Sequence, residues 1–261
     1  MAVARMTPKS SEAKVIDVPS NLKDLQIYLK SLKGRKILIF EETTTSQWLY
    51  TELNDYVDRI IVCNPYRNKL LSEGPKTDKI DAKKLCTLLK ADLLKEVFHS
   101  GNEFIYLRKF TSSYQDVVQA GVRVKNQRAA LFRAVGRDKK ETQPEGRVEQ
   151  FVFEGIDRAI AEYEKEKERY EKEFDRLARK HKLIRLLKDI PGIGVINATK
   201  LVATVVDPRR FSTKGDFLSY CGLIKLEKMS GGRSYGQKKP KYSRVLKSVF
   251  KTAALTNTIE G

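Results

Sequence analysis

The 261-residue chain has few of the features that mark secreted, membrane-spanning and metal-thiolate proteins. It has three cysteines, far apart and without Cys-x-x-Cys spacing, which excludes a disulfide scaffold or a cysteine-rich zinc site and suits a reducing cytoplasm. Its apolar runs, such as residues 37–40, are too short to cross a bilayer, and residues 1–10 lack the apolar stretch of a secretory signal. We therefore expect a cytoplasmic protein without a membrane partner.

Acidic residues are also scarce relative to basic ones. The chain has 51 Lys and Arg against 33 Asp and Glu, a formal charge of +18. Such an excess indicates a polyanionic partner, most simply nucleic acid, and the alternative is a basic solvated surface. With 41% hydrophobic residues, the chain is long enough for one large or two modest domains.

The first part of the chain has the alternating pattern of an α/β domain. Strand-like runs are residues 1–6, 13–18, 36–41 and 59–63, and helical runs lie between a cap at Ser20 or Asn21 and Gly34, at 45–53 and at 78–94. The order of strands and helices predicts a small sheet covered by helices.

The middle of the chain is helical and charged. Residues 114–135 form a basic helical stretch, a charged loop follows, and apolar residues then recur every three or four positions from Phe153 to Ile184. This heptad predicts a coiled-coil hairpin arm or a dimerisation helix, the alternative being one amphipathic helix packed on its own domain. We therefore expect an α/β domain over residues 1–110, an arm over 111–184 and a mostly α domain over 185–261.

Acidic residues at the end of one strand and in the first turn of one helix have the pattern of a metal site. Glu41 and Glu42 end a strand, where α/β sheets bind ligands, and Asp78 and Asp81 lie one turn apart after a cap at Thr77. Carboxylates from these positions suit Mg²⁺, and two such ions would clamp a phosphodiester exchange. The alternative is that the two aspartates only favour the helix N-terminus through its dipole.

Two further motifs carry glycine. Gly192 and Gly194 form a tight turn between two helical runs, which predicts a helix-hairpin-helix that grips the DNA backbone; the alternative is a structural turn. Further on, Ser230-Gly231-Gly232 precedes the basic residues Arg233, Lys238, Lys239 and Lys241. This segment is either a hydroxyl nucleophile among cations or a flexible basic DNA-binding loop. No residue nearby in sequence supplies a general base for the hydroxyl, because both histidines are remote.

Taken in order, these motifs resemble the insertion-sequence transposases that have a RuvC-like DEDD domain and a C-terminal serine-bearing domain, the bridge-RNA-guided recombinases. The resemblance covers nearly the whole chain. The matching segments are Phe40-Glu41-Glu42-Thr43, Val62-Cys63-Asn64-Pro65, Lys76-Thr77-Asp78-Lys79-Ile80-Asp81-Ala82, Ile190-Pro191-Gly192-Ile193-Gly194, residues 211–223 and Ser230-Gly231.

The resemblance implies a RuvC-like (RNase H-like) N-terminal domain and a mostly α C-terminal domain. It implies that Glu41, with Glu42 as the alternative, joins Asp78 and Asp81 in an acidic tetrad that binds Mg²⁺. It implies that Ser230, with Ser234 in reserve, attacks DNA to give a covalent 5′-phosphoserine. It also implies a structured guide RNA, a homo-oligomer with sites shared between subunits, and the bacterial cytoplasm or nucleoid.

One part of the family pattern is not found. The first aspartate of the tetrad belongs on the first strand, whereas Asp17 is only one helix upstream of residues 36–41, on what topology makes the third strand. We therefore expect a chain shortened at both ends, with weakened Mg²⁺ binding and reduced or no activity. The rival hypotheses are a RuvC-like nuclease or junction resolvase, in which water attacks, and a nucleic-acid-binding remnant without turnover.

Overall fold

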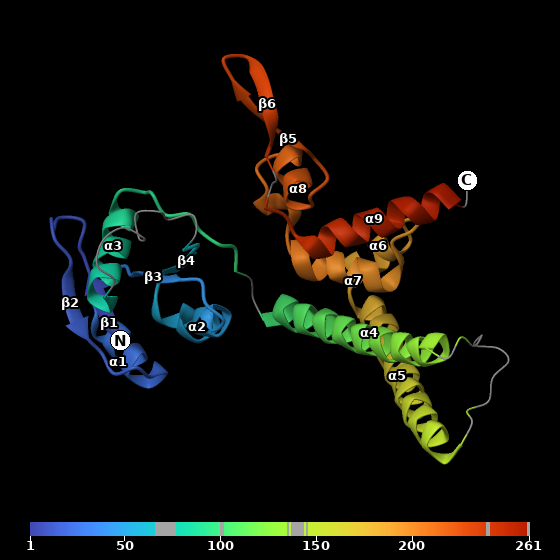
Figure 1. Cartoon of the computed structure of the whole chain (residues 1–261). Coiled ribbons are helices and arrows are strands. Elements are labelled where there is room, and N and C mark those ends of the chain that lie inside the picture. The colour runs from blue at the N-terminus through green and yellow to red at the C-terminus, as the bar shows by residue number, and fades with distance from the viewer. Residues whose placement is uncertain are drawn as a thin grey trace. The chain divides into compact units, whose positions relative to one another are not determined.

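The computed structural model describes residues 1–65, 77–99, 102–134, 136, 144, 146–238 and 241–259. The chain divides into two compact units, Met1–Gly101 (unit 1) and Asn102–Gly261 (unit 2) (Figure 1). The segment that we expected as a separate arm, residues 111–184, therefore lies in the same unit as the expected C-terminal domain, residues 185–261. None of the described helices is both long enough and apolar enough to span a bilayer.

The described part of unit 1 contains two pairs of strands. Strands β1 (Ala2–Arg5) and β2 (Lys14–Asp17) pair antiparallel, and β3 (Ile37–Glu41) and β4 (Arg59–Cys63) pair parallel. The helices are α1 (Leu22–Ser31), α2 (Ser46–Leu53), the 3-10 helix η1 (Asn54–Tyr56) and α3 (Asp78–Lys90). The expected single sheet is thus, within the described residues, two separate two-stranded ladders.

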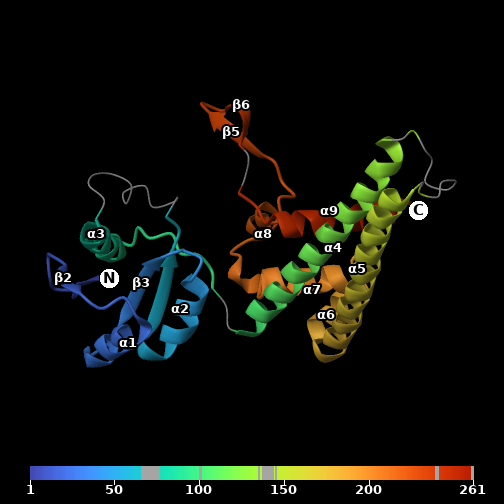
Figure 2. The same cartoon turned by 60° about the horizontal axis from the view of Figure 1, so that its bottom comes forward.

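The core of unit 1 lies between α1, α2 and the parallel strands, with α1 and α2 close to β3 (Figure 2). The buried residues Leu25 and Leu29 of α1 pack in one cluster with Leu53 of α2 and Ile60 and Val62 of β4. Helix α1 begins as predicted, because the Asn21 side chain accepts a hydrogen bond from the Asp24 N–H. The apolar face of α1 therefore fixes the helix against the strand that pairs with β3.

Helix α3 is shorter than predicted. We expected a helix over 78–94, whereas α3 ends at Lys90. Asp92 has a positive φ of 54°, the Asp92 N–H donates to Leu89 O, and the Leu93 N–H donates to Leu88 O. This bond pattern is a Schellman motif, which satisfies the last carbonyl groups and stops the helix.

Unit 2 is mostly helical, as expected for the C-terminal part. Its helices are α4 (Asn102–Ala134), α5 (Arg147–Lys180), α6 (Lys182–Lys188), α7 (Gly194–Val205), η3 (Pro208–Arg210), α8 (Lys214–Tyr220) and α9 (Arg244–Ile259), and its strands are β5 (Leu226–Ser230) and β6 (Arg233–Lys238). Ala198, Leu201 and Val202 of α7 form one buried cluster with Leu246 and Val249 of α9. The largest core of the unit is therefore built by helices.

The long helices α4 and α5 pack against each other, side by side in Figure 2. Phe174 of α5 is fully buried, with its ring 4.6 Å from that of Phe110 and 5.1 Å from that of Tyr114. The predicted heptad extended to Ile184, but α5 ends at Lys180, because His181 takes an extended conformation and α6 starts anew at Lys182. The apolar face of α5 is thus used largely inside this chain.

Candidate functional site

The strand-end glutamates lie at the carboxyl end of the β3–β4 pair. Glu41 is opposite Cys63 in the ladder and is partly buried, whereas Glu42 is exposed. The Glu42 N–H donates to Cys63 O over 2.9 Å, so the backbone stays in register one residue beyond β3. The backbone at Glu41 is therefore held in register with β4, as the sequence predicted for a strand-end carboxylate.

The two aspartates lie in the first turn of α3. The Thr77 side chain accepts a hydrogen bond from the Ile80 N–H, which confirms the predicted cap. Asp78 is exposed, whereas Asp81 is partly buried and its Oδ1 atom is buried without a hydrogen-bond partner from any described residue. The Lys84 ammonium lies 4.0 Å from that oxygen, beyond hydrogen-bond distance. Asp81 Oδ1 therefore forms a long ion pair with Lys84 but accepts no hydrogen bond from the described residues.

The three predicted carboxylates lie on neighbouring elements but are not gathered. Helix α3 contacts both β1 and β3, yet within the described residues no three His, Cys, Asp or Glu side chains are placed so as to hold a metal ion. Asp17, at the end of β2, accepts a hydrogen bond over 2.7 Å from the Lys79 ammonium at the exposed surface. This ion pair connects the end of β2 to the first turn of α3.

The glycine turn lies between α6 and α7, which pack against each other. Gly192 has a φ of +73°, and a Cβ atom there would lie 2.6 Å from the carbonyl oxygen of Ala253 in α9. At Gly194, φ is +58° and a Cβ atom would meet nothing within 4 Å. The first glycine is therefore required by packing against α9, a contact that the sequence did not indicate, and the second lies open.

The segment around Ser230 is a β-hairpin. In place of the flexible loop that was one of the two predictions, β5 and β6 pair antiparallel around Gly231 and Gly232, whose φ values are +54° and +75°. Two successive positive φ values are those of a type I′ turn, and its twist matches that of the flanking strands, so this pair of glycines closes a hairpin. Ser230 is the residue before the turn, directly opposite Arg233, and both are exposed.

The other predicted nucleic-acid-binding residues follow the hairpin. Lys238 is the last residue of β6, Lys239 lies outside the described residues, and Lys241 is exposed in the segment that leads to α9. Sequence reasoning missed Lys228 and Tyr235, which the pairing brings together: the Lys228 ammonium lies 6.0 Å from the centre of the Tyr235 ring. The alternation of side chains along each strand could have indicated this pair, but only if the position of the turn had been known.

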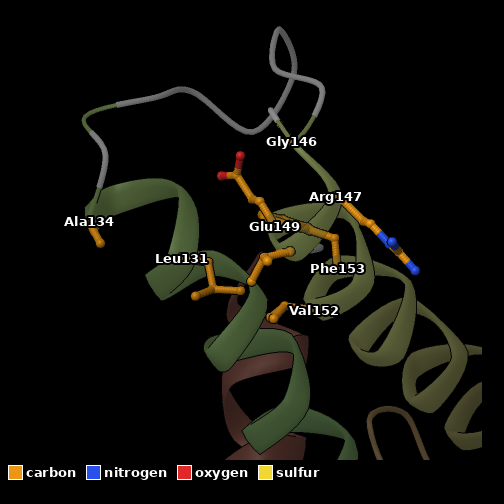
Figure 3. A pocket seen from close by; sticks show the side chains of 8 residues that line it. Leu131, Ala134, Gly146, Arg147, Glu149, Val152 and Phe153 are labelled. Atoms are coloured by element: carbon orange, nitrogen blue, oxygen red, sulfur yellow. The ribbon is translucent and has the colours of Figure 1, made fainter.

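Unit 2 also has an apolar hollow between the ends of α4 and α5. Figure 3 shows it lined by Leu131, Val152 and Phe153, with Arg147 and Glu149 nearby. None of the residues predicted to act in chemistry lies in its lining. The hollow therefore belongs to the packing of the long helices and not to the candidate site.

Two protein-family models match the chain. The model described as "Transposase IS116/IS110/IS902 family" matches residues 184–260, which include most of α6 and all of α7, the β5–β6 hairpin and α9. A second transposase model, for the DEDD domain of the same group, matches residues 9–135, which include Glu41, Asp78 and Asp81. A comparison with curated proteins finds no match.

Proposed function

Because the chain belongs to the IS116/IS110/IS902 family of transposases, we propose that it cuts and rejoins DNA by attack of the Ser230 hydroxyl on a phosphodiester. The observation that carries this proposal is the position of Ser230. Its side chain is exposed beside a tight hairpin turn, and Arg233 is the residue directly opposite in the strand pair. A nucleophile needs access to the phosphorus atom, and a nearby cation stabilises the charge that develops on the phosphate oxygens.

The proposed step is a transesterification. A bond forms between Ser230 Oγ and phosphorus while the bond from phosphorus to the 3′ oxygen breaks. The serine gives its proton to water and the departing 3′ oxygen takes one from water, so the products are a 5′-phosphoserine and a free 3′-hydroxyl. The number of phosphoester bonds is unchanged, and rejoining to another strand is the reverse attack by a 3′-hydroxyl.

We propose that Glu41, Asp78 and Asp81 are the residues that would hold a metal ion. These side chains offer only oxygen ligands, which suit Mg²⁺, and Asp81 Oδ1 accepts no hydrogen bond from the described residues. Because the three carboxylates are not gathered in this structure, holding the ion would require them to move together. A bound Mg²⁺ would neutralise phosphate charge next to the reacting strand. The chain's own contribution is the rigid strand end under Glu41 and the Thr77 cap that fixes the first turn of α3.

The nucleic acid itself would lie along the basic surfaces of the chain. The charge of +18 favours binding through phosphates, and the α6–α7 pair with the open Gly194 is our candidate for a helix-hairpin-helix contact. We further propose that the DNA is selected by a guide RNA and that a homo-oligomer combines the acidic and serine residues of different copies. The other residues that we propose to bind nucleic acid are Arg233, Lys238, Lys239 and Lys241. Gly192 contributes by shaping the turn between α6 and α7.

A covalent-trapping assay tests the proposal. The protein is mixed with DNA that carries its element's own ends, the matching RNA and Mg²⁺, and is then denatured. We expect a protein–DNA adduct that is lost in Ser230→Ala and kept in the matched control Ser234→Ala, and that needs Mg²⁺. DNA cleavage that survives Ser230→Ala would instead identify a resolvase-like nuclease, in which water attacks.

A further inference from the structure

The two faces of the β5–β6 hairpin carry different side chains. Ser230 is directly opposite Arg233, and Met229 is directly opposite Ser234. Directly opposed residues share a face of a strand pair, and successive residues lie on opposite faces. Ser230 and Arg233 therefore lie on one face, and Ser234 lies on the other.

Tyr235 and Lys228 extend the first of these faces. Tyr235 follows Arg233 by two residues in β6, so its ring lies on the same side as Ser230. The Lys228 ammonium lies 6.0 Å from the centre of that ring, which places Lys228 there too, although the pairing is irregular between Glu227 and Met229. We call Ser230, Arg233, Lys228 and Tyr235 the Ser230 face.

This hairpin does not derive its order from a hydrophobic core. Every side chain from Glu227 to Gln237 is exposed, and the Tyr235 ring keeps 66% of its surface accessible. An isolated two-stranded hairpin is marginal in water. Here an aromatic ring and two cations share one exposed face, which is the combination that proteins use to bind single strands of nucleic acid. The Ser230 face therefore has the composition of a binding surface.

The chemistry of the face identifies the ligand. A flat ring offers a stacking surface to any nucleobase, and the arginine and lysine beside it match the phosphates on either side of that base. An acidic peptide would use the cations but not the ring. We propose that the Ser230 face receives a single DNA strand, with Arg233 holding the phosphate next to Ser230 and Tyr235 stacking on the adjoining base.

This inference rests on the proposed function, since it takes the DNA strand to be the substrate of Ser230. It adds that Tyr235 and Arg233 position the strand, and that Ser230 is the nucleophile in place of Ser234 because only Ser230 shares their face. It also predicts that the base beside the cut is unpaired when it is bound, because a stacked duplex does not expose its base faces to a ring.

Photocrosslinking on the full chain tests the contact locally. The probe is a 30-nucleotide single DNA strand in which every thymine is replaced by 5-iodouracil, and long-wavelength irradiation couples such a base to an aromatic ring stacked on it. We expect the crosslinked peptide to contain Tyr235, and we expect Tyr235→Leu, which keeps an apolar side chain but no ring, to abolish that product. Crosslinks found only at other positions would overturn the proposal.

Affinity for the same strand is the second readout. We expect Tyr235→Ala to weaken binding about tenfold and Tyr235→Phe to change it little, since stacking uses the ring. Arg233→Ala should lower the slope of log affinity against log salt by about 0.7, the loss of one phosphate contact on a single strand. The opposite-face controls Met229→Ala and Ser234→Ala should bind as the wild type does; equal losses on both faces would overturn the proposal.

Different results would contradict the serine mechanism and the binding face. Crosslinking at Tyr235 without a serine adduct would leave the binding face in place and contradict the serine mechanism. A Ser230 adduct formed equally well by Tyr235→Ala, with no crosslink at Tyr235, would leave the mechanism in place and contradict the binding face.

Discussion

The candidate acidic residues of unit 1 lie on elements that form or pack on its core, whereas the candidate serine of unit 2 lies on a hairpin outside the core of that unit. In unit 1, Glu41 ends a strand whose partner β4 is almost wholly buried, and Asp81 lies on a helix that packs on the strands. In unit 2, Ser230 lies on a hairpin of exposed side chains, while the core is formed by residues such as Phe174 and Leu246. Replacing the partly buried Glu41 or Asp81 should therefore affect the stability of unit 1 more than replacing the exposed Ser230 affects that of unit 2.

The largest effect on stability should come from the core of unit 2. Phe174→Ala removes a fully buried ring that contacts Phe110 and Tyr114, and should lower the free energy of unfolding by about 4 kcal/mol. Urea denaturation followed by circular dichroism measures this. Hydrogen exchange should rise in α4 and α5; unchanged exchange there would contradict the assigned core.

A smaller effect should come from the glycine turn. Gly192→Ala places a methyl group 2.6 Å from Ala253 O at a positive φ, and should cost about 3 kcal/mol. Gly194→Ala is the matched control, because its surroundings are open, and should cost about 1 kcal/mol through backbone strain alone. Equal melting temperatures for the two variants would show that Gly192 does not pack against α9.

Helix caps then compare the two units directly. Thr77 caps α3, and Thr213 caps α8 in a capping box with Asp216, so replacing either threonine by alanine should cost about 1 kcal/mol. Thr77→Ala should also weaken the Mg²⁺ dependence of adduct formation, since the cap fixes the turn that carries Asp78 and Asp81. Thr213→Ala should leave that dependence unchanged. Adduct formation is measured against Mg²⁺ concentration in both variants, and an equal shift of the two curves would contradict this difference between the units.

The smallest effect on stability should come from the serine itself. Ser230→Ala changes one exposed hydroxyl and should alter the free energy of unfolding by less than about 0.5 kcal/mol. Thermal unfolding by circular dichroism measures this. A clear loss of stability would mean that the hairpin contributes to the fold of unit 2, contrary to its exposure.

Local signals in the sequence predicted much of this fold. Asn21 and Thr77 start their helices because their side chains satisfy free backbone N–H groups, a rule that needs only neighbouring residues. The early end of α3 was missed because it depends on Asp92 taking a positive φ, which aspartate does only in a suitable local context. The break at His181 was missed because the apolar spacing continues across it into Ile184.

The candidate site was predictable in its residues but not in its arrangement. The strand end at Glu41 and the turn that carries Asp78 and Asp81 follow from strand and cap patterns, yet whether the carboxylates meet depends on packing between α3 and the strands. For Ser230, the missing information was the strand register. The glycine pair determines that register, and the register determines that Arg233, and not Ser234, shares the face of the nucleophile.

The most direct test is to find the residue that becomes bonded to DNA. The adduct formed with the element's DNA, RNA and Mg²⁺ would be digested with nuclease and protease, and the modified peptide sequenced by mass spectrometry. The account predicts a nucleotide attached through its 5′-phosphate to Ser230. A nucleotide on Ser234 or on any other residue, or cleaved DNA with no modified peptide, would contradict it.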